Sequence, residues 1–308
     1  MPALPISDLD AHRLQSMRID HMNEAFRALF VIGALAGALP TWVHATEGGG
    51  SVYPNGTENF LSGALPPPGL YGIVYGSHYR STRVNGSEGQ NLNVPGFNLT
   101  ANVVAPRLVW VTGVKVLGGD LAVHAIVPLV DIKVTAGGVR QSKSGLGDVL
   151  TGLGLGFHHS KNFHSIAAVD IYLPTGRYDT TDIANLGRNQ YAIEPVFSVT
   201  YLDPSGVNAD IKSGFVFNGR NKKTDYRSGG EFHFDYALGW DLGNGWGLGV
   251  GGFYYHQVCD DRQFGQDVAN SRAGAFAIAT FAEVRQRPGL VFHREMARRG
   301  SSEESRAR

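Results

Sequence analysis

The sequence has few cysteines, few charged residues and no long hydrophobic run, and each shortage excludes a class of protein. Only one of the 308 residues, Cys259, is a cysteine, so a disulfide within the chain is impossible. Lysine and arginine together number 27, as do aspartate and glutamate, so the chain lacks the basic excess of a nucleic-acid-binding protein. The one continuously apolar segment, residues 28–39, is shorter than the roughly 20 residues of a transmembrane helix.

Glycine and aromatic residues are abundant instead. The chain contains 41 glycines, 16 phenylalanines, 12 tyrosines and 4 tryptophans, and only 18% of its residues are charged. Aromatic side chains favour strands, and this much glycine with so few charges is not typical of a helical protein. The composition therefore predicts a β-rich fold.

The start of the chain has the features of an export signal. The apolar segment follows Arg27, and the small residues after it end in Val43-His44-Ala45, the pattern of a signal-peptide cleavage site. We interpret residues 22–45 as a signal peptide that is cut before Thr46, and residues 1–21 as an upstream extension. A membrane anchor and a buried core helix are the alternatives for the apolar segment.

The remaining chain is expected to form a membrane barrel. Residues 46–69 are rich in glycine and proline and predict a lead-in on the periplasmic side. Residues 70–292 contain segments that alternate strictly between large apolar and polar or small side chains, most clearly at 231–242 and again at 189–201 and 207–218. A soluble sandwich alternates too, but segments this long cover the 9 to 11 residues that a barrel strand needs to cross a bilayer.

The connections between these segments alternate between short and long, as do the periplasmic turns and outer loops of outer-membrane barrels. The short turns are predicted at 118–119, 160–162, 203–206 and 243–245, and the longer polar loops at 84–95, 137–145, 177–188, 221–230 and 260–271.

The strand count is odd where an even number is expected. Eleven strands are predicted to begin near residues 70, 97, 120, 147, 163, 189, 207, 229, 246, 272 and 289. Single-chain bacterial barrels normally have an even number, so we expect an all-β, antiparallel transmembrane barrel of about twelve strands. The twelfth strand should follow Phe292, where residues 293–308 form instead a charged tail that we expect to be disordered. An altered end of this kind puts barrel closure and assembly in doubt.

Several segments resemble a known bacterial family. The stretches at 145–159, 173–206 and 221–261 are similar to proteins assigned to the meta pathway of phenol degradation, and the resemblance covers roughly 70–292. Its most specific part is the run Asn221-Lys222-Lys223-Thr224-Asp225-Tyr226-Arg227-Ser228-Gly229. The resemblance implies an outer-membrane channel for hydrophobic or aromatic compounds, although the arginine-rich end departs from the family, whose members end in an apolar strand.

The polar faces of the predicted strands carry the candidate site. As lumen-lining residues we predict Asp148, Asp170, Glu194, Asp210, Lys212, Glu231, His233 and Asp235, with Phe253 and Tyr255 as candidates for stacking on a ligand. One interpretation is a selectivity lining. The other is that these charges only satisfy one another inside a narrow, water-containing barrel.

Other motifs have simpler explanations. The glycines of 247–252 match G-x-G-x-x-G, but no helix follows to bind a dinucleotide. His158, His159 and His164 surround one turn without a recognisable metal-ligand spacing, and Asp260, Asp261 and Asp267 fit a solvated acidic loop better than a calcium site. We predict no metal, no cofactor and no functional thiol at Cys259. An aromatic girdle is predicted from Tyr191, Tyr201, Tyr236, Trp240, Trp246, Tyr254 and Tyr255.

The function predicted from the sequence is passive uptake of small hydrophobic or aromatic compounds across the outer membrane of a Gram-negative bacterium, without catalysis. Its expected partners are the solute, outer-membrane lipid and lipopolysaccharide, and the barrel-assembly machinery, but no nucleic acid. The alternatives are a structural or adhesive surface barrel and an outer-membrane lipid hydrolase. A hydrolase needs a serine and histidine pair at one membrane edge, and outward-facing His256 has no evident serine partner.

Overall fold

The computed structural model describes residues 30–36, 50–85, 89–203, 206–242, 246–286 and 290–296, with the side chains of 30–36, 284–286 and 290–296 left aside. Every regular element of these segments is a β-strand. The described segments contain no helix that is long and apolar enough to cross a membrane. The predicted upstream extension, 1–21, and the end of the predicted tail, 297–308, lie outside the described residues.

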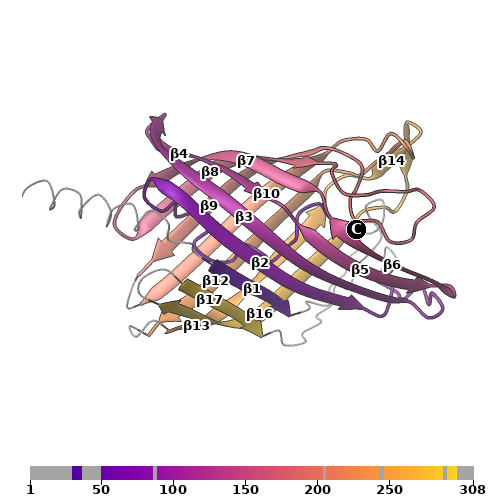
Figure 1. Ribbon diagram of the computed structural model, residues 1–308, viewed down its shortest axis with the longest axis horizontal. Coiled ribbons are helices and arrows are strands. Elements are labelled where there is room, and N and C mark those ends of the chain that lie inside the picture. Colours follow the sequence, from indigo (N-terminus) through magenta and orange to yellow (C-terminus); the bar gives the residue numbers. More distant parts are fainter. Residues whose placement is uncertain are drawn as a thin grey trace, which may run out of the picture.

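Eleven consecutive antiparallel strands of the described chain form the wall of a barrel (Figure 1). They begin within three residues of the predicted starts, so the predicted strand order is confirmed. The strands are β2 (Gly69–Ser81), β3 (Asn98–Val116), β4 (Gly119–Ile126), β7 (Val149–His158), β8 (Phe163–Leu173), β9 (Ala192–Leu202), β10 (Val207–Asn218), β12 (Glu231–Asp241), β13 (Trp246–Gln257), β16 (Gly274–Gln286) and β17 (Leu290–Met296).

A twelfth strand closes the ring, but it comes from the start of the chain. Strand β1 (Phe30–Ala36) lies between β17 and β2 and runs parallel to both, and the pairing of β2 with β3 completes the circle. Because the first and last of eleven alternating strands point in the same direction, β1 has the same orientation relative to both neighbours. In the full chain, part of the predicted signal peptide thus occupies the place where the sequence predicts a strand after Phe292. The signal peptide itself stays a prediction.

The last wall strand continues four residues beyond the predicted boundary between barrel and tail. We expected the barrel to end at Phe292, but β17 continues to Met296, whose backbone lies opposite Thr280 of β16. Backbone pairing to a neighbouring strand does not depend on side-chain polarity, so this charged sequence still pairs with β16 as far as the middle of that strand.

The predicted polar loop at 137–145 is a hairpin instead. Strands β5 (Leu129–Ala136) and β6 (Val139–Leu146) are joined by Gly137 and Gly138, which have φ of 57° and 84°. This positive φ is accessible to glycine at little cost. The hairpin pairs with the first half of β3, whereas β4 pairs with its second half, so the long β3 supports two neighbours. Figure 1 shows β5 and β6 continuing the wall beyond the shorter strands.

The two faces of the strands match the predicted alternation. On β9, Glu194 and Thr200 are fully buried, whereas Phe197 is 52% exposed. Large apolar side chains are exposed in the same way around the outside of the barrel, as on β3, β8, β10, β12 and β13. A soluble monomer rarely exposes apolar surface on this scale, so the outer face is suited to lipid.

The longer loops gather at one end of the barrel. Three short strands, β11 (Tyr226–Arg227), β14 (Asp261–Gln263) and β15 (Gln266–Val268), form a small separate sheet that joins the loop after β10 to the loop after β13. At the other end, tight turns such as Leu117-Gly118, both with positive φ, connect neighbouring strands.

If the outer face of β10 contacts lipid, a charge placed on it should destabilise the barrel more in the middle of the strand than at its start. Ile211 lies near the middle of this strand and Val207 at its start, and both point outward with similar exposure, 43% and 40%. We expect Ile211→Arg to lower the free energy of unfolding from lipid vesicles by about 2–4 kcal/mol and Val207→Arg by about 0–1 kcal/mol. Urea titration of the vesicle-inserted protein measures both values. Equal costs at the two positions would contradict the assignment.

Candidate functional site

A segment before the first wall strand fills part of the barrel interior. Residues 50–68, the plug segment, make hydrogen bonds to inward-facing side chains of the wall. Asp235 of β12 accepts three of them: from the Tyr53 hydroxyl at 2.6 Å, the Gly56 amide at 2.9 Å and the Glu58 amide at 3.1 Å. The Tyr53 ring also stacks on His233, with ring centroids 3.9 Å apart. One wall carboxylate therefore anchors the first turn of the plug.

The plug continues along the neighbouring strands β10 and β9 and then reaches β3 on the other side of the lumen. The Ser62 amide donates to Asp210 at 3.2 Å, and the Gly63 amide donates to Thr200 at 2.9 Å. Leu65 then packs on a buried apolar cluster that contains Val109 and Val111. The sequence predicted a lead-in on the periplasmic side and left open whether it plugs the lumen. The segment does lie outside the sheet, but it occupies the lumen, because its amides satisfy carboxylates that would otherwise be buried without partners.

Glu58 is the charged centre of the plug. Its carboxylate forms an ion pair with Arg107 of β3 and a second with Lys212 of β10, whose Nζ lies 2.6 Å from Oε2. The Tyr75 hydroxyl donates to Oε1 at 3.1 Å. Burial alone would raise the pKa of Glu58, but the positive charges of Arg107 and Lys212 outweigh it and hold this pKa well below its usual value. The carboxylate is therefore ionised and holds two opposite walls together.

Sequence reasoning missed Tyr53, Glu58 and Arg107. Arg107 had a detectable signal, because it occupies an inward position in the alternation of β3, opposite Ile73 of β2. The plug residues had none, since a glycine- and proline-rich segment without periodicity does not reveal which cavity it fills.

The structure brings most of the predicted lumen residues together. His233 and Glu194 are fully buried, with Nε2 of the histidine 2.9 Å from Oε1, and the Tyr172 hydroxyl donates to the other carboxylate oxygen. Asp170 lies 2.9 Å from Nε2 of His124. Those that point into the lumen and are at least nine-tenths buried are Asp170, Glu194, Asp210, Lys212, Glu231, His233, Asp235 and Tyr255. Their role as a selectivity lining stays a prediction.

Two predicted lining residues are only partly buried, although Asp148 does line the cavity described below. Phe253 faces inward opposite Asp235 but is only half-buried. Asp148 lies outside the strands, where it accepts hydrogen bonds from the amides of Arg188 at 2.6 Å and Gly176 at 2.9 Å. Burial raises the pKa of Asp148, and these amides oppose the shift. Asp148 therefore closes the base of the loop between β8 and β9.

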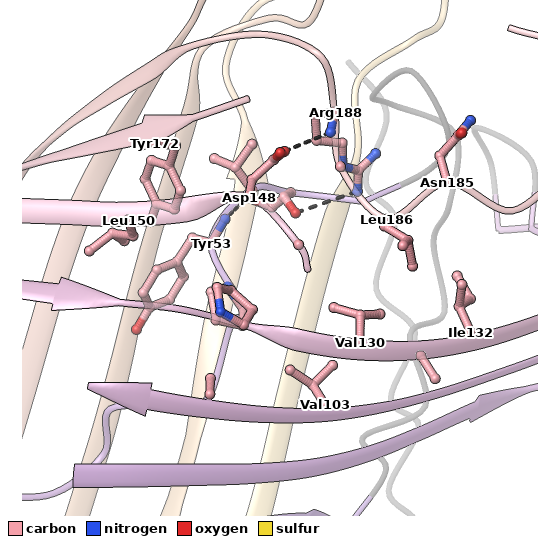
Figure 2. A pocket seen from close by; sticks show the side chains of 18 of the residues that line it. Tyr53, Val103, Val130, Ile132, Asp148, Leu150, Tyr172, Asn185, Leu186 and Arg188 are labelled. Carbon is pink, nitrogen blue, oxygen red and sulfur yellow. Dashed lines mark hydrogen bonds between the residues drawn. The ribbon is translucent and has the colours of Figure 1, made fainter. Parts of the chain in front are cut away.

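A cavity of about 770 Å³ remains between the plug and one side of the wall. Figure 2 shows Tyr53 of the plug near Leu150 and Tyr172, and Asp148 bonded to Arg188 at its rim. Mostly apolar side chains from β3, β5, β7 and the loop before β9 face this space, among them Val103, Val130, Ile132, Leu150, Ile183 and Leu186. Small-molecule sites in proteins are typically concave, largely apolar and roughly 300–1,000 Å³ in volume.

The run that carries the family resemblance is a loop scaffold. Asn221 is fully buried and accepts from the amide of Lys223 and the side chain of Asn189. The Tyr226 hydroxyl and the Gly229 amide both donate to Asp261 of β14. Burial raises the pKa of Asp261, and these donors oppose the shift. Three further residues of the run lie around this core. Ser228 is buried, and the carbonyl of Thr224 accepts a hydrogen bond from Gln263. Asp225 forms an ion pair with Arg220 at 2.7 Å.

The remaining predicted motifs are placed as follows. Nδ1 of His158 lies 2.8 Å from Nδ1 of His164, and within the described residues no group of three His, Cys, Asp or Glu side chains could hold a metal ion. The glycine-rich run 247–252 lies inside strand β13. Of the predicted girdle, Tyr191, Tyr201, Trp240 and Trp246 are well exposed, but Tyr255 is buried and does not belong to it, because it shares the inward face with His233.

The fold and the site define a class: an antiparallel β-barrel of the outer-membrane type whose lumen holds an N-terminal plug and an apolar cavity. The chain belongs to the family described as the MetA-pathway of phenol degradation, whose sequence profile matches residues 81–281. The predicted resemblance is thereby confirmed.

The solved structures include a similar fold. An outer membrane channel from Pseudomonas putida F1 superimposes with a TM-score of 0.64 and 18% sequence identity, over 76% of this chain and 90% of that one. At this identity the likeness shows the fold alone. No curated protein sequence matches the chain.

Because Asp235 anchors the plug segment, removal of its carboxylate should make the plug segment open more often. Asp235→Ala removes the acceptor of three plug hydrogen bonds, and bonds to a charged group contribute about 1.5–3 kcal/mol each. We expect amide hydrogen exchange over residues 50–63 to speed up by at least about tenfold. Asp131→Ala is the matched control, because the hydrogen bonds of Asp131 go to Asn102 and Ser144, away from the plug. Unchanged exchange in Asp235→Ala would show that the plug does not depend on this carboxylate.

The loop scaffold predicts a strict requirement for glycine at position 229. A Cβ at Gly229 would lie 1.9 Å from the Cys259 carbonyl oxygen, whereas a Cβ at Gly72 would meet nothing within 4 Å. Gly229→Ala must therefore shift the backbone that donates to Asp261, and we expect it to lower the free energy of unfolding by about 1–3 kcal/mol. Gly72→Ala should leave it nearly unchanged. Thermal denaturation of both variants measures the difference, and equal stability would contradict the assigned contact.

Proposed function

We propose that the protein is an outer-membrane channel of a Gram-negative bacterium for the passive uptake of small hydrophobic, in particular aromatic, compounds. The observation that carries the proposal is the apolar cavity inside the barrel, bounded on one side by the plug segment. A closed protein without a solute to pass would have no reason to keep so large an unfilled space, since interiors are otherwise packed to the density of organic crystals.

The chemistry of the cavity supports the class of solute. Its wall contains valine, isoleucine and leucine side chains together with Tyr53, Tyr75 and Tyr172. The hydroxyl groups of these three tyrosines donate hydrogen bonds to carboxylates. The rings therefore present apolar faces, on which an aromatic compound can stack. A strongly hydrated ion would lose its water in this space without receiving enough polar partners.

The family and the similar structure support the same role. The family description refers to phenol degradation, and the similar structure from Pseudomonas putida F1 is an outer membrane channel. In a passive channel the solute gradient supplies the driving force. A solute that leaves the cavity through the lumen has to pass the plug, so in this proposal the bonds of Asp235 and Glu58 govern the opening of the channel.

The proposal predicts that filling the cavity blocks transport. Ala101 of β3 lines the cavity, whereas Ala167 of β8 is exposed on the outer face. We expect Ala101→Trp to reduce the uptake of a small aromatic compound into vesicles by about tenfold or more, because the indole occupies the space of the solute. Ala167→Trp should transport as the unmodified protein does, since an aromatic side chain is tolerated at a lipid-facing position.

The measurement is a radiolabelled solute uptake assay in vesicles, with heat-modifiable mobility on gels as the check of insertion. If both variants and the unmodified protein insert but none raises uptake above empty vesicles, the channel proposal fails. A structural or adhesive role of the loops would then be the hypothesis to pursue.

A further inference from the structure

A second recess lies on the outside of the barrel at its long-loop end. It has a volume of about 380 Å³ and lies between the end of β10 and the loops that carry β11 and β14. Three arginines, Arg227, Arg262 and Arg272, border it together with Asp260 and Asp267. None of these side chains takes part in the lumen or the plug, so the proposed transport function does not account for them.

The arginines are arranged in a way that costs free energy without a ligand. Arg227 of β11 and Arg262 of β14 are direct cross-strand partners, and like charges in this position repel each other. Within the described residues, Arg262 pairs with Asp267 at 2.7 Å and Arg272 pairs with Asp260 at 3.0 Å, but no ion pair of Arg227 is found. The recess therefore carries one more positive than negative charge.

The guanidinium groups are accessible from outside. The side chains of Arg262 and Arg272 are 62% and 54% exposed, and Arg227 is exposed as well. The Arg227 Nε donates to the Asn218 carbonyl at 3.0 Å. This bond fixes the side chain while both terminal nitrogens keep donors for a ligand.

The floor of the recess is apolar and continues into the lipid-facing surface. Phe215 and Phe217 of β10 line it, with ring centroids 4.7 Å apart, and Phe217 is 53% exposed. The neighbouring outward side chains Phe232 and Val258 are also exposed. A positively charged recess thus borders directly on the apolar outer surface.

We propose that this recess binds the phosphate group of a lipid in the surrounding leaflet, with the acyl chains of that lipid lying along Phe217. Arginine offers a planar pair of donors that matches a phosphate bidentately, and the anion relieves the repulsion between Arg227 and Arg262. A soluble anion would use the charge but not the adjoining apolar surface, so a phosphorylated lipid is the ligand that fits both. The inference rests on the proposed membrane location but not on solute transport.

The test is a binding experiment on the purified full-length protein in detergent micelles, with fluorescent lipopolysaccharide as the probe and a chelator present to remove bridging cations. Arg227→Gln removes the charge and keeps a donor for Asn218. Arg220→Gln is the matched control, because Arg220 is also an exposed arginine but pairs with Asp225 outside the recess. We expect Arg227→Gln to weaken binding by about tenfold, the effect of one lost charge-assisted contact, and Arg220→Gln to leave it unchanged.

Two further arms identify the ligand. Enzymatically dephosphorylated lipopolysaccharide should bind the unmodified protein about tenfold more weakly, and inorganic phosphate alone should compete poorly. Equal binding of the dephosphorylated lipid, or an unchanged affinity of a correctly folded Arg227→Gln, would overturn the proposal. Inorganic phosphate that competes as well as the lipid would overturn the assignment to a lipid. Since no solute flux is measured, a failed channel proposal leaves these outcomes unaffected.

Discussion

Charges inside a narrow barrel have to be paired, and the ionic contacts of Glu58 meet this constraint in the middle of the molecule. Arg107 of β3 and Lys212 of β10 stand on opposite sides of the lumen, and both point inward among buried groups. Without the plug, each would be buried without its carboxylate, and removing one partner of a buried pair costs about 3–5 kcal/mol. The plug segment is therefore part of the folded barrel. Tyr53, Asp235, Asp210 and Thr200 extend the same principle along its length.

The pairing of charges in the lumen also determines where the cavity lies. The plug makes hydrogen bonds to β9, β10 and β12 and an ion pair to Arg107 of β3, and it leaves the apolar side chains of the first half of β3, of β5 and of the start of β7 uncovered. The cavity therefore lies between the plug with its ion pairs on one side and aliphatic side chains of the wall on the other. A hydrophobic compound can occupy this cavity without competing for the hydrogen bonds that hold the plug. Binding and plug release are thus separate events in the proposed channel.

The outside of the barrel obeys a different rule, because lipid can accept apolar side chains but not unpaired backbone groups. The exposed phenylalanine, leucine and tryptophan side chains of β9, β12 and β13 fit this environment. The ring closes through β1, so that each of the twelve ring strands has two neighbours in the full chain, whereas β6 of the hairpin pairs with β5 alone. At the long-loop end, the small sheet of β11, β14 and β15 places arginines directly above the apolar belt, which gives this rim a chemistry of its own.

The alternation of side chains along the chain is enough to specify the strands, their order and their two faces. Alternation with a period of two is a local property, so the sequence alone assigns residues such as Glu194, Lys212, Glu231 and Asp235 to the interior. The family can also be recognised from the sequence, because its most specific motif is a continuous run that begins at Asn221. What these side chains contact follows instead from the tertiary fold. Glu58 and Lys212 are 154 residues apart, Tyr53 and Asp235 are 182 apart, and no periodicity relates them. The plug, the cavity beside it and the closing position of β1 all depend on how distant segments share one enclosed space, and pairing of this kind is a property of the closed ring.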